Sequence, residues 1–270
     1  MKENWRTFFG FGTEPFGSDI ALKNILETDD LLGVRDRFEY ATRIGGAALV
    51  TGEIGSGKST ALRHAIGRLH PSEWRTLHVT ASSGSILELY RQILGELGME
   101  TASLSRAKMT VRIKKEIVEI VQNKHMKVVL VVDEASLLRL DVFRELHTLL
   151  QFNQDTTPWL PLILSGQSNL VDKLRYRDSG PLASRIVARS HLGGGDRDAT
   201  EKYIRHHLKI AGVESDLFDE SATTAIHQGS GGLFRKANHL ARGALIAAAA
   251  EKSMTVCAEH VRLASTEIFL

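Results

Sequence analysis

Residues 49–60 carry the pattern that most restricts the fold of this chain. They read Leu-Val-Thr-Gly-Glu-Ile-Gly-Ser-Gly-Lys-Ser-Thr and match the phosphate-binding loop G-x-x-x-x-G-K-S/T at every fixed position. An apolar, strand-like run at 47–50 leads into the loop, and a helix-compatible run at 61–66 leads out of it. Because the motif needs a strand before it and a helix after it, this context favours a nucleotide-binding loop over a glycine-rich turn that binds nothing.

Each part of the loop has its own task in holding a phosphate. Its glycines permit positive φ angles and close backbone approach, so that successive N–H groups can point at one anion. A helix that begins near Lys58 adds the partial positive charge of its N-terminus. Lys58 would reach the β- and γ-phosphates, and the Ser59 hydroxyl would bind Mg²⁺. The predicted nucleotide-binding residues of the loop are Gly52, Glu53, Ile54, Gly55, Ser56, Gly57, Lys58, Ser59 and Thr60.

Strand-like apolar runs alternate with helical patterns as far as about residue 192. The continuous β-branched run at 128–132 suits a strand covered on both faces, as in a parallel sheet. The fold class is therefore α/β, a parallel sheet flanked by helices and followed by an all-helical C-terminal region. We predict strands at 47–50, 76–80, 128–134, 160–167 and 186–192, and helices at 36–43, 85–97, 106–124, 139–150, 197–211, 219–228, 232–250 and 257–265.

This pattern divides the chain into three parts. We assign 1–44 to an N-terminal leader, 45–195 to the α/β nucleotide-binding core and 196–270 to a helical lid. The aromatic-rich leader is too short to fold alone, so we expect it to pack onto the domain that follows. It would serve either as an arm on the adenine side of the nucleotide or as a simple packing arm.

Composition bears on the partner and the compartment. The 270 residues carry a formal net charge of +2, which permits an anionic partner without demanding one. The single cysteine, Cys257, excludes an intramolecular disulfide and is consistent with a reducing cytoplasm. No secretory signal is visible, and the longest membrane-like run, 244–250, is far shorter than the roughly 20 residues that a spanning helix needs. We expect a cytoplasmic protein without direct membrane insertion.

Asp133 and Glu134 end the apolar strand predicted at 128–134. The carboxylate of Asp133 can hold Mg²⁺, often through water. The carboxylate of Glu134 can orient and deprotonate the water that attacks the γ-phosphorus. A solvated acidic pair at a strand end is the alternative. The phosphate loop upstream makes the catalytic interpretation the stronger one.

Three further residues are candidates for the chemistry at the γ-phosphate. Gln167 follows a buried strand and could hydrogen-bond the γ-phosphate or the attacking water, with Ser165 as the alternative. Arg185 and Arg235 are candidate cations for the charge of the transition state. Taken alone, either arginine is more often a surface residue.

The order of these motifs resembles that of AAA+ ATPases. The runs 131–135, 164–167, 184–186 and 232–235 follow the phosphate loop as the corresponding motifs do in that family. More narrowly, the chain resembles the group that contains the ExeA secretion ATPases and the transposition ATPases of the TniB, TnsC and MuB kind. The leader, with Phe-Gly-Phe at 9–11 and Pro-Phe at 15–16, resembles the opening of ExeA-type proteins.

This resemblance implies a Mg²⁺-dependent ATPase that hydrolyses ATP to ADP and phosphate. It implies that Arg185 is an arginine finger acting in trans on the nucleotide of a neighbouring subunit. Arg235 matches the sensor-2 arginine of the lid, which also contacts the nucleotide. Since a finger in trans needs a neighbour, the resemblance implies a homo-oligomer, either a ring or a helical filament.

The group contains two kinds of function. ExeA-type proteins continue into a membrane span and a peptidoglycan-binding segment, and neither follows Leu270. We therefore expect an ATP-dependent, non-sequence-specific duplex-DNA-binding ATPase that oligomerises on DNA and regulates or targets a transposase. One alternative is an ExeA-like ATPase that serves a secretion or envelope-assembly membrane partner. The other is a nucleotide-gated scaffold with negligible hydrolysis.

The predicted DNA contacts lie on the helix at 106–124. Residues 106–127 carry seven Lys or Arg against two Glu, and at 100° per residue one face collects several of these cations. Such a face could follow phosphates, or it could be an ordinary solvated surface. A second basic cluster, at 202–209, is expected to be solvated or to lie between subunits. The candidate DNA-binding residues are Arg106, Lys108, Arg112 and Lys115.

Overall fold

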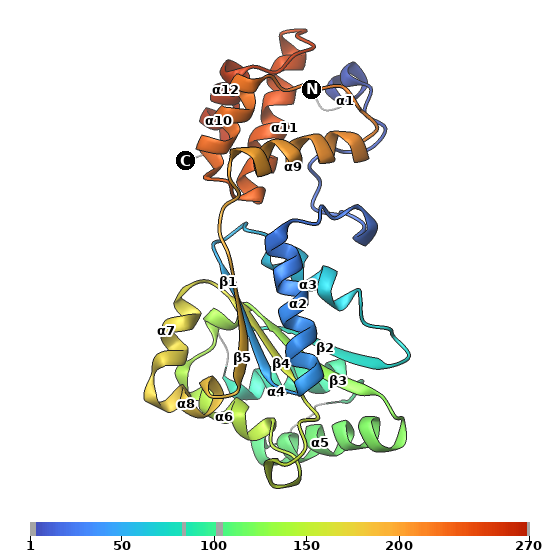
Figure 1. Ribbon diagram of the computed structural model, residues 1–270, viewed down its shortest axis with the longest axis vertical. Helices are drawn as coiled ribbons and strands as arrows, with labels where there is room; N and C mark the ends of the chain where they lie inside the picture. The colour runs from blue at the N-terminus through green and yellow to red at the C-terminus, as the bar shows by residue number, and fades with distance from the viewer. Residues whose placement is uncertain (1–3, 83–84, 101–104, 269–270) are drawn as a thin grey trace. The chain divides into compact units, whose positions relative to one another are not determined.

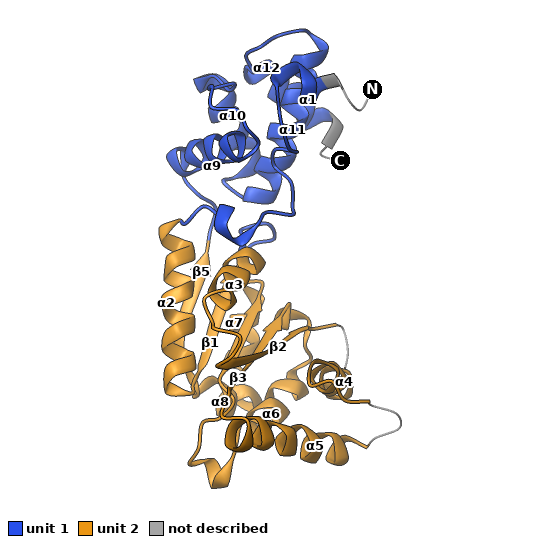
Figure 2. Cartoon of the chain, turned by 90° about the vertical axis from the view of Figure 1, so that its right-hand side faces the viewer, with its two compact units in different colours: residues 1–27, 53–57, 193–270 blue, residues 28–52, 58–192 orange. Residues whose placement is uncertain are grey.

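The computed structural model describes residues 4–82, 85–100 and 105–268. The first three residues of the predicted leader and the last two of the predicted lid lie outside that part. The chain forms two compact units, coloured separately in Figure 2. Unit 1 contains residues 1–27, 53–57 and 193–270, and unit 2 contains residues 28–52 and 58–192. Each unit has its own hydrophobic core.

Unit 2 is built on a five-stranded sheet of order β2-β3-β4-β1-β5, in which every pairing is parallel (Figure 1). All five strands that the sequence predicts are confirmed. The inner strands β1 and β4 are buried along their whole length, which is why they read as continuous apolar runs. The strands are β1 (Ala47–Gly52), β2 (Trp74–Thr80), β3 (Lys127–Asp133), β4 (Leu162–Gly166) and β5 (Ile186–Leu192).

Helix α2 (Asp29–Ile44) is twice as long as the helix predicted at 36–43. Its start is fixed by Thr28, whose hydroxyl oxygen accepts a hydrogen bond from the backbone N–H of Leu31 at 3.3 Å. Its end is fixed by Gly45, which adopts a left-handed conformation with φ of 73°. The cap residues therefore carried the boundary information that apolar periodicity alone missed.

The other helices of unit 2 cover the sheet. Two of them, α7 and α8, were not predicted, because they are short and lie among Gly and Pro residues. The long helix predicted at 106–124 ends as an α-helix at Val118 and continues as a π-helical turn, Glu119–Asn123. The helices are α3 (Lys58–Ile66), α4 (Ile86–Glu96), α5 (Arg106–Val118), α6 (Leu140–Leu149), α7 (Asn169–Arg175) and α8 (Gly180–Ala183).

Unit 1 joins the N-terminal leader to the C-terminal helices. The C-terminal helical region predicted from residue 196 onward is confirmed, and Asp196 and Asp219 cap its first two helices by accepting backbone N–H bonds at 2.7 Å. Short 3₁₀ turns occur at Leu22–Asn24, Ala135–Leu137, Asn153–Asp155 and Arg177–Ser179. The helices of unit 1 are α1 (Asn4–Phe9), α9 (Arg197–Ile210), α10 (Glu220–Ser230), α11 (Phe234–Ala250) and α12 (Ala258–Ile268).

The leader packs differently from our expectation. We predicted that it packs onto the domain that follows it, but its aromatic side chains belong to the core of the C-terminal helices. Helix α11 buries a row of alanines, and α1 lies against α11. Alanine side chains leave space that large aromatic rings can fill at close packing. The leader residues in this core are Trp5, Phe9, Phe11 and Phe16.

Candidate nucleotide-binding site

The phosphate loop has the backbone that its glycines predict. Gly55 and Gly57 adopt positive φ angles of 87° and 98°, which residues with a Cβ rarely adopt. Gly52 instead ends β1 within the sheet. The Ser56 N–H donates to the carbonyl of Glu53 at 3.2 Å, and the buried Ser56 hydroxyl has no partner among the described residues. A phosphate oxygen would satisfy that hydroxyl.

Helix α3 begins at Lys58, directly after the loop, as the motif predicts. Lys58 is only 7% exposed, and its ammonium donates to the Gly52 carbonyl at 2.9 Å. The Ser59 hydroxyl donates to Oδ2 of the buried Asp133 at 3.0 Å. Adjacent ligands of an octahedral Mg²⁺ ion, each about 2.1 Å from the metal, lie about 3 Å apart. Ser59 and Asp133 therefore have the chemistry and the spacing that Mg²⁺ needs.

Glu134 stands just beyond the end of β3 in a left-handed conformation, with φ of 52° and ψ of 31°. Its N–H donates to Oδ1 of Asp133 at 2.9 Å, which holds the Asp133 carboxylate against the backbone of Glu134. A non-glycine residue in this region costs on the order of 1 kcal/mol, and such strain gathers at functional sites. The backbone therefore leaves the direction of β3 at Glu134, whose side chain is half-buried.

Two residues that the sequence did not single out hold the turn after Glu134. Lys173 on α7 donates to the carbonyls of Ser136 at 2.6 Å and Leu138 at 2.8 Å. A Cβ on Gly166 would lie 2.8 Å from the backbone nitrogen of Ser136. Glycine at the end of a strand often marks such a close approach, so that signal was available. No sequence signal pointed to Lys173.

Gln167 lies where the sequence predicts it, just beyond β4. The register pairs Thr51 with Gly166 and Val132 with Leu164, so β4 ends between the strands that carry the phosphate loop and Asp133. Gln167 is half-buried. Its alternative, Ser165, is fully buried inside the sheet and its hydroxyl has no partner among the described residues. The position of Gln167 suits a contact to the γ-phosphate better.

Arg235 lies against the phosphate loop within unit 1. Its backbone N–H donates to the Gly55 carbonyl at 3.2 Å, and a Cβ on Gly55 would lie 2.8 Å from the Cβ of Arg235. The ring of Phe234 lies beside Gly57 and is in turn packed by Tyr203, with ring centroids 4.5 Å apart. The start of α11 thus contacts the loop by backbone and by side chain.

Arg185, the predicted arginine finger, is paired inside this chain. Its Nη2 donates to both carboxylate oxygens of Asp155, at 2.7 and 2.6 Å. The hydrogen bond from Arg185 lowers the pKa of the Asp155 carboxyl. Asp155 ends a turn in which three consecutive residues have positive φ, 47° at Asn153, 56° at Gln154 and 69° at Asp155. The arginine must leave this carboxylate before it can contact a neighbouring subunit.

The basic face of α5 is present. Lys108, Arg112 and Lys115 line one shallow hollow, together with the carboxylate residue Glu116. Arg112 donates to the backbone carbonyl of Glu100 at 3.3 Å. Arg106 turns to Glu145, with an N–O distance of 2.6 Å, so its charge is neutralised within the chain.

The second basic cluster is partly solvated, as expected, because Lys202, Arg205 and Lys209 are exposed. His207 is 4% exposed and belongs to the interior of unit 1, where burial lowers its pKa to about 4. Arg205 is paired with Asp216 and Glu201. Elsewhere, the described residues contain no group of three or more His, Cys, Asp or Glu that could hold a metal ion. Among the helices that the structure describes, none combines the length and the apolar character of a membrane span.

Comparison with known proteins supports the fold and the binding of a nucleotide. Residues 43–174 match the AAA domain family. The chain is 28% identical over 262 residues to the general secretion pathway protein A of Aeromonas hydrophila, and the match covers 97% of this chain. This chain spans 48% of the length of that relative.

Solved structures with the same fold share less sequence. Cdc6p from Pyrobaculum aerophilum has a TM-score of 0.70 at 17% identity, covering 97% of this chain and 71% of that one. The Orc1 protein of Aeropyrum pernix, solved in complex with DNA, has a TM-score of 0.68 at 19% identity, covering 92% and 67%. The RuvB Holliday junction branch migration motor of Thermotoga maritima has a TM-score of 0.57 at 20% identity, covering 90% and 70%.

These comparisons change the ranking of the functions that we drew from the sequence. We preferred a transposition role because no membrane span follows Leu270. The relative matched over nearly the whole chain is a secretion protein about twice as long, so the position of Leu270 carries no such weight. The secretion alternative is therefore favoured over the transposase regulator. The chain therefore has the fold of these solved structures, and its residues 43–174, which include the phosphate loop, resemble an AAA domain.

Proposed function

We propose that this chain is a Mg²⁺-dependent ATPase that works as a homo-oligomer and serves a membrane partner in secretion or envelope assembly. The carrying observation is the match to the secretion pathway protein across 97% of this chain. That match extends beyond the 43–174 segment of the AAA domain into the leader and the C-terminal helices. A relationship limited to nucleotide binding would not require those parts.

The proposed reaction is in-line attack of water on the γ-phosphate of ATP. Bound Mg²⁺, held by Ser59 and Asp133, would neutralise phosphate charge. The Lys58 ammonium gives up its bond to the Gly52 carbonyl and binds phosphate oxygens. Glu134 takes a proton from the attacking water, and Gln167 orients that water molecule.

Two arginines complete the proposed site. Arg235 brings its positive charge from the start of α11, which contacts the phosphate loop. Arg185 acts on the nucleotide of a neighbouring subunit after it leaves Asp155. Because charge builds on the transferred phosphoryl group, each cation stabilises the transition state more than the ground state. A finger of this kind contributes a factor of about 10³ or more to the rate of hydrolysis.

The test compares two variants with opposite effects on the nucleotide state. Glu134→Gln is expected to bind ATP and to retain it, whereas Lys58→Ala is expected to bind it poorly. Each variant carries a photo-crosslinking residue on an exposed surface and is expressed in the native cell. The proposal predicts crosslinks to one envelope protein that are strong in Glu134→Gln and weak in Lys58→Ala. Crosslinking that ignores the nucleotide state, or that reaches no envelope protein, would contradict it.

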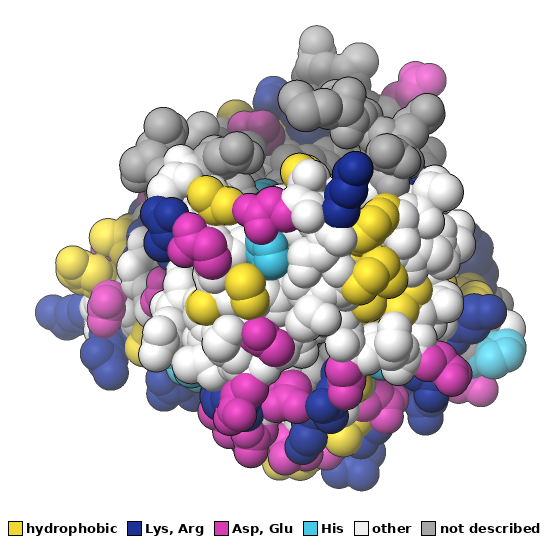
Figure 3. Space-filling model, turned by 90° about the horizontal axis from the view of Figure 1, so that it is seen from above, with side chains coloured by type: hydrophobic (Ala, Val, Ile, Leu, Met, Phe, Trp, Pro, Cys, Tyr) yellow, Lys and Arg dark blue, Asp and Glu magenta, His cyan; other side chains and the backbone are white. Residues whose placement is uncertain are grey.

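A second candidate, binding of duplex DNA in the ATP state, is favoured by one observation. Lys108, Arg112 and Lys115 lie around a single hollow on α5, so repeated subunits would offer the same face in a row. Figure 3 shows the molecule from above relative to Figure 1. On that face, basic and acidic side chains are interspersed. If DNA binds through α5, Lys108→Ala/Lys115→Ala weakens binding and reduces its dependence on salt by about two phosphate contacts. Binding that is unchanged in this variant would exclude the α5 surface.

A further inference from the structure

A hollow of about 440 Å³ lies at the amino-terminal edge of the sheet in unit 2. Its lining includes Trp74 at the start of β2, Lys127 at the start of β3 and Pro161 just before β4. The strands are parallel, so Gly52 and Asp133 end theirs at the opposite edge. At about 3.3 Å per residue, a six-residue strand separates the two edges by about 20 Å. The hollow is therefore not part of the nucleotide site.

Three cations line this hollow against one carboxylate. Arg43, Arg68 and Lys127 are exposed, and the single acidic residue of the lining is Glu39. Among the described residues, none of the three cations forms an ion pair. Lys127 lies with its Nζ 5.3 Å from the centroid of the Trp74 ring. These charges are available to a ligand that carries negative charge.

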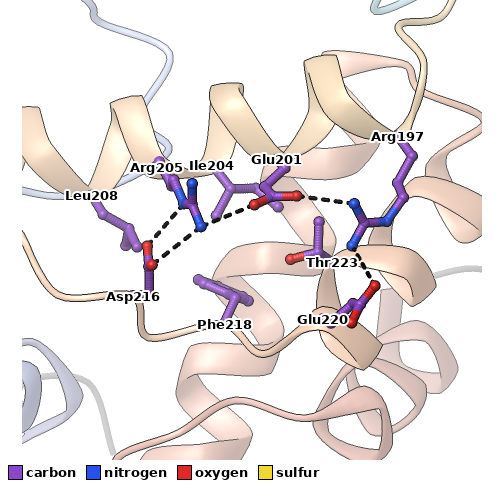
Figure 4. A pocket seen from close by; sticks show the side chains of 9 residues that line it. All are labelled: Arg197, Glu201, Ile204, Arg205, Leu208, Asp216, Phe218, Glu220 and Thr223. Carbon is purple, nitrogen blue, oxygen red and sulfur yellow. Dashed lines mark hydrogen bonds and ion pairs between the residues drawn. The ribbon is translucent and has the colours of Figure 1, made fainter.

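A second hollow, in unit 1, shows what an internally neutralised pocket looks like (Figure 4). It has a volume of about 320 Å³ and contains two arginines, each between two carboxylates. Arg197 contacts Glu201 at 3.0 Å and Glu220 at 3.4 Å, and Arg205 contacts Glu201 and Asp216, both at 2.9 Å. An anionic ligand would have to displace these partners, which the hollow in unit 2 does not require.

The apolar part of the unit 2 hollow is rigid and aromatic. Trp74 and Trp159 are half-buried, and Trp159 packs on Phe152 with ring centroids 5.7 Å apart. Pro158 packs so closely on Gly45 that a Cβ there would lie 2.2 Å from the proline Cβ. Aromatic rings held in this way offer large contact area at a small cost in conformational entropy.

The backbone around the hollow does not suit a phosphate. Many phosphate sites in proteins add backbone N–H groups and the positive ends of helices to their basic side chains. Here Arg43 and Gly45 mark the C-terminal end of α2, and Arg68 follows the C-terminal end of α3. Helix C-termini carry partial negative charge and present carbonyl groups, and proline has no N–H to donate. A ligand that brings its own N–H donors and apolar groups fits such walls.

We propose that this hollow docks an acidic peptide segment of a partner protein. An apolar or aromatic side chain of the segment enters between Trp74 and Trp159. Its carboxylates reach Arg43, Arg68 and Lys127 at the rim, and its backbone N–H groups face the helix C-termini. Charge-assisted bonds of this kind set specificity as well as affinity. This site requires no bound nucleotide, so its test is independent of the ATPase proposal.

The experiment uses the full-length chain and a display library of hexapeptides composed of Asp, Glu, Pro, Leu and Phe. The pocket variant is Arg68→Glu/Lys127→Glu. The matched control is Arg91→Glu/Arg177→Glu, which makes the same change in charge at exposed positions outside the hollow. Selected peptides are then titrated in a Trp5→Phe background, in which Trp74 and Trp159 are the only remaining tryptophans and report binding by fluorescence.

We expect the same acidic, apolar sequences to be enriched on the wild type and on the control. The pocket variant should bind these peptides at least about tenfold more weakly. A short oligothymidylate and vesicles of phosphatidylglycerol and phosphatidylcholine serve as rival probes. The proposal is overturned if no sequence is enriched or if enriched peptides bind the pocket variant equally well. It is also overturned if a rival probe, and not a peptide, depends on Arg68 and Lys127.

Discussion

His207 makes the stability of unit 1 depend on pH between about 4 and 6.5. Its ring is stacked on Phe16 with centroids 5.4 Å apart and contacts Tyr203 at 4.4 Å. Burial, with a smaller contribution from the charge of His206, lowers the pKa of His207 from 6.5 to about 4. The buried ring is therefore neutral in the folded protein near neutral pH.

The sign and the size of the effect follow from the two pKa values. The unfolded chain takes up a proton on His207 near pH 6.5, but the folded protein does so only near pH 4. The contribution of His207 to the free energy of unfolding is therefore fully present above about pH 6.5 and is lost as the pH drops towards 4. A difference of about 2.5 between the two pKa values, at about 1.4 kcal/mol for each pKa unit, amounts to about 3.5 kcal/mol. At pH 5 the expected loss is about 2 kcal/mol.

The assay follows urea unfolding of unit 1 by the fluorescence of Trp5, which lies in the same core as His207. Replacing Trp74 and Trp159 by Phe leaves Trp5 as the only tryptophan. The free energy of unfolding is measured at pH 7.5 and pH 5. His207→Phe should lose about 2 kcal/mol less than the wild type between these values, and the exposed control His239→Gln should behave as the wild type. Equal losses in His207→Phe and the wild type would refute the assignment of the pH dependence to this ring.

Three further predictions concern the nucleotide site. Glu134→Gln should lower kcat for ATP by a factor of at least about 10² while leaving ATP affinity within about threefold, as measured by steady-state kinetics and titration. Gly55→Ala places a methyl group against the start of α11 at an unfavourable φ. It should therefore destabilise the loop by about 1–3 kcal/mol and weaken ATP binding about tenfold or more. The control Gly95→Ala, at a helical position with open space, should have neither effect. Asp155→Ala frees Arg185 and should raise ATP turnover at a fixed protein concentration; turnover equal to that of the wild type would show that the pair does not restrain the arginine.

The sheet and the phosphate loop could be predicted from the sequence because each depends on residues that are close together in the chain. A buried parallel strand such as β3 is a continuous apolar run, and the loop needs specific glycines at fixed spacing. The start of α2 was missed because the cap residue Thr28 was not considered. The sequence placed Asp133 at the end of β3, but it also placed Glu134 in the strand, and the left-handed turn there was not predicted.

The remaining features depend on contacts between distant parts of the chain. Periodicity could not show that the ring of Phe16 stacks on His207, because 190 positions separate them in sequence. The pairing of Arg185 with Asp155 depends on a turn of three left-handed residues that carries no glycine. Lys173 supports the turn after Glu134 through two carbonyls, and any exposed helix lysine looks the same in sequence.

The shared core of leader and lid has a consequence for synthesis on the ribosome. The leader aromatics are made before the C-terminal segment that buries them, which begins at residue 193, after the whole of unit 2. At about 5–20 residues per second, the 165 residues from 28 to 192 take roughly 8–33 seconds. For at least that time Trp5, Phe9 and Phe11 lack the core that covers them in the finished protein. The speed of translation through residues 28–192 therefore sets how long the nascent chain exposes these aromatic side chains and is prone to aggregate.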